Sequence, residues 1–200
     1  MKTPLLILLT FVATCAHSQV ERAPLEEAQK AVLHLNNALG ELKDAPFRLE
    51  VNAFKPCAIK GDGQAAALVV PAYSLSERIQ DARRKTAIPA GQLWLHKVVP
   101  TVNGKAVPKE ALRLIKVKAD EGEIEVSMFH LAYERYGDGG KLQVFGKGKE
   151  PLLEVMLKSM KVPQETPLEI EVKKDESGAP QLVFYVADKF EGRMPLALAE

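Results

Sequence analysis

Cysteine is scarce in this chain of 200 residues, which contains only Cys15 and Cys57. Small domains that are held together by disulfides need several cysteine pairs, so a disulfide framework is excluded. A zinc site built from cysteine pairs is excluded for the same reason. Residues 19–200 are numerous enough to bury one hydrophobic core without cross-links, and we expect them to form a single domain.

The chain also lacks an excess of either charge. Only Lys2 of its 27 basic residues, and none of its 26 acidic residues, falls within the first eighteen positions, so the remainder is formally neutral. Nucleic-acid binding needs a positive field, and we therefore expect no nucleic-acid partner. Aromatic residues make up 6% of the sequence, which leaves little material for binding sugars or single strands by stacking.

Motifs for catalysis and metal binding are missing as well. The sequence has no Gly-x-Ser-x-Gly turn, no His-Glu-x-x-His helix and no glycine-rich phosphate loop before a helix. We predict no catalytic residue, no metal site and no cofactor, and we predict that the protein is not an enzyme. One alternative is a zinc or copper site, in which His96, His130 and a carboxylate such as Glu134 converge. Another is an enzyme with a dispersed site, because catalytic residues need not be contiguous in the sequence. His130 shares the predicted core face of its strand, which favours a hydrogen-bonded buried histidine over a ligand.

The N-terminus is typical of a secretory signal peptide. Lys2 precedes an uncharged apolar run from Pro4 to Ala16, and Ala16-His17-Ser18 fits the small-x-small pattern of a processing site. The run is shorter than the roughly 20 apolar residues of a membrane span, and no later segment is long and apolar enough to be one. We predict that residues 1–18 are removed and that the mature protein is exported, soluble, to the periplasm or the medium.

A lipid anchor is the alternative fate of this N-terminus. Val12-Ala13-Thr14-Cys15 resembles a bacterial lipid-attachment sequence, in which Cys15 would be acylated and retained. The exported protein would then be anchored to a membrane.

An amphipathic helix is predicted over residues 24–44. Pro24 suits a first helical turn, and Pro46 prevents the helix from continuing. We expect the apolar stripe to pack on a sheet of the same chain, with pairing to a second copy as the alternative. The stripe has the spacing of three and four that marks one helix face, and it consists of Leu25, Ala28, Val32, Leu35, Leu39 and Leu42.

The rest of the sequence has the period of strands. Alternating or continuous apolar runs are separated by turns such as Gly61-Asp62-Gly63. We predict a mainly β fold of the α+β type, either an antiparallel β-sandwich or a curved open sheet of about nine strands, with the N-terminal helix packed on it. The predicted strands are 47–53, 65–70, 114–119, 124–133, 141–145, 152–160, 168–173, 181–187 and 194–198.

An arginine-rich segment interrupts the strands. Ser74-Leu-Ser-Glu77 fits a capping box that opens a short helix through Arg78, Ile79, Arg83 and Arg84, with Lys85 directly after it. The three arginines and Lys85 are candidate contacts for an acidic partner or for lipid headgroups. The alternative is a solvated helix face, because Glu77 and Asp81 offset part of the charge.

Trp94 and His96 are the other candidate binding residues. Both lie on one face of a strand predicted over residues 92–99, while Leu93 and Leu95 occupy the other face. An exposed tryptophan beside an imidazole would suit a sugar. The alternative is that a second layer covers Trp94, because tryptophan is highly buried on average.

Cys57 would be the only thiol of the mature chain. Counting alternate residues from Phe47 places it on the core face, where a free cysteine behaves as a small apolar residue. The alternative is a reactive or intermolecularly paired thiol, with Lys55 and Lys60 supplying positive charge.

These features together favour an exported, non-enzymatic envelope protein that acts as a binding or structural module for an unknown protein or envelope component. The signal peptide, the leading helix, the curved strands and Gly91-Gln-Leu-Trp-Leu95 resemble the lipoprotein-carrier family of the bacterial periplasm. The resemblance implies the main alternative, a carrier of lipid or of lipidated protein. It covers the helix and that pentapeptide, so no functional residue is transferred. A carrier requires an apolar cavity of several hundred cubic ångströms.

Overall fold

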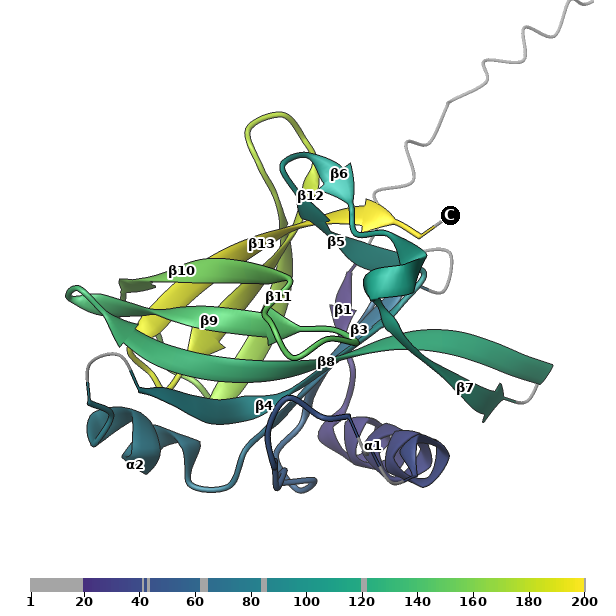
Figure 1. Ribbon diagram of the computed structural model, residues 1–200, viewed down its shortest axis with the longest axis horizontal. Helices are drawn as coiled ribbons and strands as arrows, with labels where there is room; N and C mark the ends of the chain where they lie inside the picture. The colour runs from purple at the N-terminus through teal and green to yellow at the C-terminus, as the bar shows by residue number, and fades with distance from the viewer. Residues whose placement is uncertain are drawn as a thin grey trace, which may run out of the picture.

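One curled antiparallel sheet makes up most of the molecule (Figure 1). The structure is a computed structural model that describes residues 20–40, 42, 44–61, 65–83, 86–119 and 122–199. The predicted signal peptide and the alternative lipid site at Cys15 lie outside these residues. No helix in the described ranges combines the length and the apolar character needed to cross a bilayer.

The described residues contain two α-helices and thirteen strands, rather than about nine. The helices are α1 (Leu25–Leu39) and α2 (Leu75–Gln80), with one 3-10 turn at Lys109–Ala111. The strands are β1 (Glu21–Arg22), β2 (Cys57–Lys60), β3 (Ala66–Pro71), β4 (Ala87–His96), β5 (Val98–Val102), β6 (Lys105–Ala106), β7 (Arg113–Ala119), β8 (Gly122–Tyr136), β9 (Gly139–Phe145), β10 (Leu153–Ser159), β11 (Leu168–Lys174), β12 (Pro180–Val186) and β13 (Phe190–Leu198).

The sheet has the order β1-β2-β3-β4-β8-β9-β10-β13-β12-β11, and β5, β6 and β7 branch from it. It curls until β11 lies against β2 and β3, so that the sheet forms a half-barrel. Long β8 pairs with β4 on one edge, and with β7 and then β9 on the other. The β7–β8 hairpin therefore extends beyond the end of β4.

A bulge in β4 contributes to the curl. The register between β4 and β8 shifts between Pro89 and Gly91, and such an insertion bends a strand and increases its twist. Gly91 has φ +155°, and a Cβ atom there would stand 2.3 Å from the carbonyl oxygen of Val70 on β3. Only glycine permits this close approach of the two backbones.

The inner face of the curled sheet encloses the larger of two apolar clusters. Leu93 on β4, Phe129 on β8 and Phe184 on β12 are fully buried there. Leu75 and Ile79 of α2 join the same cluster. Residues from both halves of the sequence thus form the inner core. This packing fixes the positions of the strands that carry the outer face.

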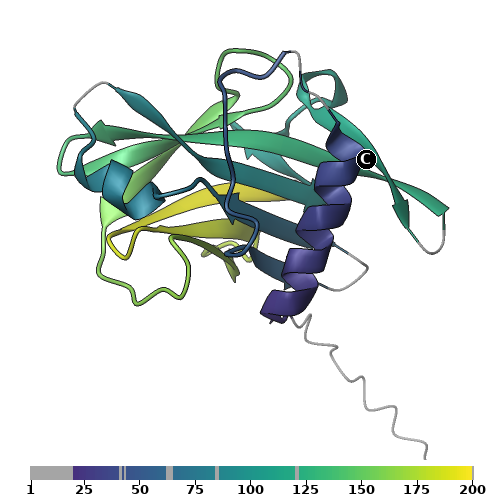
Figure 2. The same ribbon diagram turned by 90° about the horizontal axis from the view of Figure 1, so that it is seen from below.

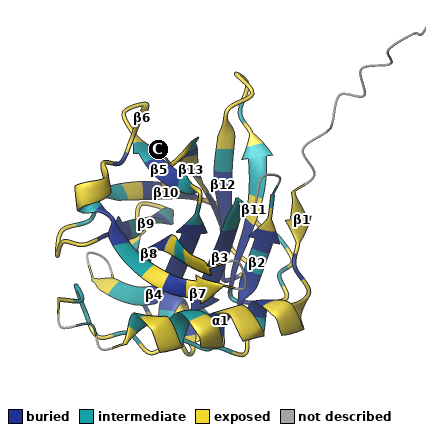
Figure 3. Ribbon diagram, turned by 90° about the vertical axis from the view of Figure 1, so that its right-hand side faces the viewer, coloured by how far each residue is buried: buried dark blue, intermediate teal, exposed yellow. Residues whose placement is uncertain are grey.

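Helix α1 lies across the outer face of the sheet (Figure 2). Ala28 and Val32 are its buried residues, and they pack in the second apolar cluster with Leu68, Trp94 and Met128. The helix is shorter than the predicted 24–44: it ends at Leu39, because Gly40 adopts the left-handed φ of +60° that breaks the helical ladder. Most of α1 is exposed (Figure 3). Leu25, assigned to the packed stripe, is 52% exposed.

The predicted strand over residues 47–53 is wrong. That stretch contributes only an isolated bridge between Val51 and Ala72, and the strand next to β3 is β2. Its alternating apolar residues belong to a loop that lies on the sheet, where the Phe47 ring meets His130 and Phe145 edge to face. A loop that packs on an apolar surface alternates covered and exposed residues in the same way as a half-buried strand.

The capping box at Ser74 does not form, although a helix begins at Leu75. Ser74 has a left-handed conformation and makes no side-chain cap hydrogen bond. An N-cap residue needs an extended backbone to turn its hydroxyl towards the helix.

Candidate functional site

A groove of about 590 Å³ lies between α1 and the outer face of the sheet. We call it the α1 groove. The helix forms one wall, the β2–β3 hairpin and the β7–β8 hairpin form the sides, and the end of β4 forms the floor. Its apolar lining comes from Ala23, Ala28, Ala31, Leu35, Ala58, Ile59, Ala66, Ala67, Leu68, Trp94, Leu95, Val117, Ala119, Ile124 and Val126.

The architecture explains why this apolar surface remains open. Strand β4 ends at His96. Lys97 then takes a positive φ, and the chain continues into β5, which pairs with β13 and not with β8. The pairing of β4 with β8 ends at Leu95 and Ser127, and the β7–β8 hairpin continues past this point, so Ile124 has no β4 residue opposite it. Small alanines on α1, β2 and β3 then leave the space between helix and sheet unfilled.

Trp94 lies on the floor of the groove. Its side chain is only 3% exposed, and its Nε1 donates a hydrogen bond of 3.3 Å to Oε1 of Gln92. The helix covers it, so the alternative of a buried Trp94 is the arrangement found. The indole is fixed in place and still contributes its apolar surface to the groove.

Two histidines bind the backbone of the β7–β8 hairpin at the rim of the groove. His34 Nε2 lies 2.9 Å from the carbonyl oxygen of Lys118, and His96 Nδ1 lies 3.0 Å from that of Glu125. A carbonyl oxygen only accepts, so each of these nitrogens carries a hydrogen. The two imidazoles thereby attach α1 and β4 to the projecting hairpin.

The charged rim consists of three lysines and one carboxylate. Glu27 forms an ion pair with Lys60 at the β2 end of the helix. Lys30 pairs with Glu26 at 2.7 Å one helical turn away. Lys118 stands at the β7 end, next to His34.

A second hollow of about 420 Å³ adjoins the groove. Ile59, Ala66 and Ala67 line both spaces. The second is also lined by Val20, Gly61 and Ala65 and by residues of β5, β11, β12 and β13, including Val98, Val172 and Leu196. A third hollow of about 300 Å³ lies between Thr101–Asn103 and β10. The α1 groove is the largest of the three.

The arginine candidates do not reach the groove. Arg78 is half-buried on α2 and Arg83 is exposed beyond its end, and neither lines the α1 groove. Arg84 and Lys85 lie outside the described residues. Of the five candidate binding residues, Trp94 and His96 are brought together at one site.

The three groups of the alternative metal site, His96, His130 and Glu134, do not converge. His96 binds Glu125 at the end of β4, whereas His130 and Glu134 pair with Gln92 and Ala87 further along. Among the described residues, no group of three or more His, Cys, Asp or Glu side chains has the arrangement of a metal site.

His130 is buried on the outer face, beneath Phe47. Its Nδ1 has no hydrogen-bond partner among the described residues, so the predicted hydrogen bond is missing at that atom. Burial, followed by the nearby Arg113 guanidinium, lowers the pKa of His130 to about 4, against the opposing effect of Asp44. Arg113 is itself held by Asp44 at 2.8 Å and by the Lys147 carbonyl at 3.2 Å. The histidine is therefore neutral at pH 7.

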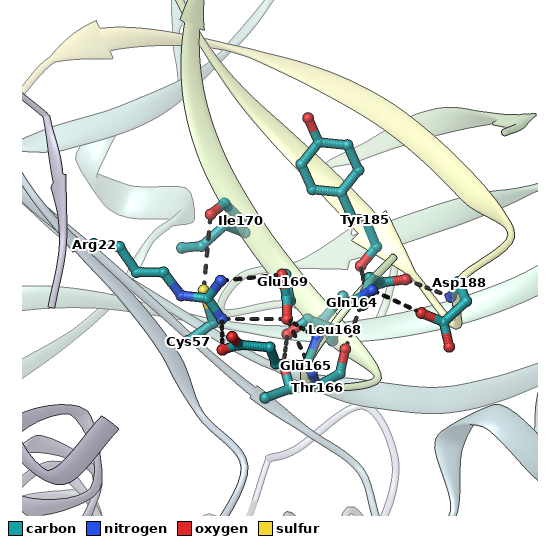
Figure 4. A network of polar contacts seen from close by, with 10 residues as sticks. All are labelled: Arg22, Cys57, Gln164, Glu165, Thr166, Leu168, Glu169, Ile170, Tyr185 and Asp188. Carbon is teal, nitrogen blue, oxygen red and sulfur yellow. Dashed lines mark hydrogen bonds and ion pairs between the residues drawn. The ribbon is translucent and has the colours of Figure 1, made fainter. Parts of the chain in front are cut away.

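Cys57 is buried where β2 meets β11, as its position on the core face predicted. Its Sγ lies 3.7 Å from the carbonyl oxygen of Ile170, and burial raises the pKa of its thiol (Figure 4). Beside it, Arg22 of β1 bridges to Glu169 at 3.2 Å. The Glu169 carboxylate also accepts the backbone N–H of Thr166 at 2.9 Å, so it ties β1 to the loop before β11.

We expect the Cys57 thiol to react with dithionitrobenzoate at least about tenfold more slowly in the folded protein than in denaturant, because a buried thiol must wait for local opening. The measurement is the rate of thionitrobenzoate release. Equal rates with and without denaturant, or a disulfide-linked dimer on a non-reducing gel, would contradict a purely structural thiol.

Sequence reasoning missed the rim of the groove. His34 was not among the candidates, and Lys118 belongs to a strand more than eighty positions away. The position of His34 next to Leu35 of the helical stripe was the only available signal. No protein family, curated protein or solved structure matches the chain.

Proposed function

We propose that this protein is an exported, non-enzymatic binding protein that holds an apolar chain in the α1 groove. The observation that carries this proposal is the groove itself, an apolar space of about 590 Å³ that helix and sheet leave open. Ligand sites typically measure roughly 300–1,000 Å³ and are lined mainly by apolar side chains with a few polar groups. The α1 groove has both properties.

The lining supports binding of a long aliphatic chain. The apolar residues that line the groove are alanine, valine, leucine and isoleucine, together with Trp94 on the floor. Each CH₂ group that such a chain buries contributes about 0.8 kcal/mol, so several groups together give substantial affinity. In this role the protein is a carrier. Helix α1, packed on the sheet, forms the wall that retains the ligand.

The polar groups of the groove support binding rather than catalysis. His34 and His96 are both engaged by backbone carbonyls, and Glu27 is engaged by Lys60. These contacts hold the walls in position. Export directed by the predicted signal peptide, residues 1–18, would place the mature protein outside the cytoplasm. There it could carry apolar chains through water.

The test is a series of linear alkanoates of eight to fourteen carbons, titrated against the purified mature protein. Trp94 is the only tryptophan and lies on the groove floor, so its fluorescence reports occupancy directly. We expect affinity to rise about fourfold for each added CH₂ until the groove is full, which corresponds to about 0.8 kcal/mol per group.

A matched pair of variants locates the binding site. Ala31→Phe fills the groove from α1, whereas Ala38→Phe makes the same change on the same helix beyond the groove lining. Only the first should weaken binding. An affinity that is independent of chain length, or equal losses in the two variants, would contradict the proposal.

A further inference from the structure

The charged side chains at the α1 groove are already paired. Glu27 forms an ion pair with Lys60, and Lys30 forms one with Glu26 at 2.7 Å. Opposite charges in contact cancel most of each other's field for a third group. None of these four side chains is therefore an unpaired partner for a charged head group.

Lys118 adds no free ammonium group to the groove. Val117 packs in the apolar cluster beneath α1, and successive side chains of a strand point to opposite faces, so the Lys118 side chain belongs to the other face of β7. Its cross-strand partner is Glu123. Lys118 presents its carbonyl oxygen to the groove, where His34 binds it at 2.9 Å. Among the described residues, the lining thus has no unpaired charge.

His34 and His96 are the remaining polar residues of the lining. Each uses one ring nitrogen to donate to a backbone carbonyl of the β7–β8 hairpin, so the other nitrogen of a neutral ring is an acceptor with a lone pair. In His96 the donor is Nδ1 and the acceptor is Nε2. This Nε2 atom has no partner among the described residues, and it is not buried.

His96 lies beside Trp94 on the groove floor. The two residues are two positions apart, so their side chains project from the same face of β4. The His96 ring is half-buried and is held 3.0 Å from the Glu125 carbonyl oxygen, whereas His34 is exposed on α1. The polar end of a ligand that lies on Trp94 therefore meets an acceptor in a fixed ring rather than a charge.

We propose that the ligand of the α1 groove is an uncharged aliphatic chain that ends in a hydroxyl group, which donates a hydrogen bond to Nε2 of His96. This inference rests on the proposed function. A hydroxyl group supplies the hydrogen that a neutral imidazole accepts, and it is less costly to remove from water than a carboxylate. The chain contacts Trp94 and the alanines and contributes most of the affinity.

The experiment compares decan-1-ol, its isomer 1-methoxynonane and decanoate. The ether has the composition of the alcohol but no hydrogen to donate. Affinities are measured through Trp94 fluorescence at pH 8.5, above the range in which histidine side chains ordinarily change charge. We expect the alcohol to bind about two- to tenfold more tightly than the ether, the usual effect of one hydrogen bond, and decanoate to bind most weakly.

The His96→Asn variant assigns the preference to one nitrogen. The asparagine amide can replace Nδ1 as the donor to Glu125, but the side chain has no acceptor at the place of Nε2. We expect the ratio of the affinities for the alcohol and the ether to fall to about one. His34→Gln is the matched control, because its amide replaces the bound Nε2 of that ring, and it should keep the ratio. Circular dichroism checks that both variants are folded.

The outcomes separate the two proposals. If the ether binds as tightly as the alcohol, or if decanoate binds most tightly, the hydroxyl inference fails and the proposed function stands. The same holds if His96→Asn keeps the ratio or if His34→Gln abolishes it. If none of the three probes binds, both proposals fail.

Discussion

Replacing Phe184 by alanine should lower the free energy of unfolding by about 3–5 kcal/mol, the usual cost of removing a buried phenyl ring from a core. Phe184 is fully buried on β12 and belongs to the inner cluster together with Leu93 of β4 and Phe129 of β8. Strands from both halves of the curled sheet surround it, so the cavity cannot close by moving one element. Urea denaturation followed by circular dichroism measures the loss.

Phe54→Ala is the matched control, because that ring is 74% exposed in the loop before β2. Surface substitutions usually change stability by less than about 0.5 kcal/mol. Similar losses in the two variants would mean that the inner face of the sheet is not the core of the protein.

Acidification from pH 6.5 to pH 4 should destabilise the protein through His130 by an amount on the order of 3 kcal/mol. The pKa of this histidine is lowered from 6.5 to about 4 in the folded state. Between these values the unfolded chain binds a proton that the folded chain does not, so stability falls as the pH falls. Above pH 6.5 the histidine is neutral in both states, and its effect on stability is constant.

The His130→Asn variant isolates this effect from the carboxylates that titrate in the same range. The free energy of unfolding of both proteins is measured by urea denaturation at several pH values. We expect the variant to lose less stability than the wild type between pH 6.5 and pH 4, whatever its stability at pH 7. Parallel pH profiles would show that His130 becomes protonated in the folded protein as easily as in the unfolded chain.

Local periodicity predicted the mainly antiparallel β character of the fold, because alternation along strands such as β8 and β12 is a property of neighbouring residues. It failed at residues 47–53, where a loop packed on the sheet imitates a strand. It also extended α1 to residue 44, because the spacing of Leu42 continues the stripe although Gly40 ends the helix. Backbone conformation at single residues decided these boundaries.

The candidate site was predicted only in part. Trp94 and His96 share one face of a strand, and the structure places both at the α1 groove. Their sequence position gave no sign that α1 and the β7–β8 hairpin would enclose them, because that depends on the lengths of β4 and β8. Lys118 and His34 meet through a contact between distant segments, which periodicity does not encode.

The most direct test of the central claim uses dodecanoate brominated near the end of its chain, because bromine quenches tryptophan fluorescence only at short range. We predict that this probe quenches Trp94 on binding, that unbrominated dodecanoate displaces it, and that Ala31→Phe abolishes the effect while Ala38→Phe does not. Binding that leaves Trp94 unquenched would place the chain elsewhere on the protein and would contradict the α1 groove as its site.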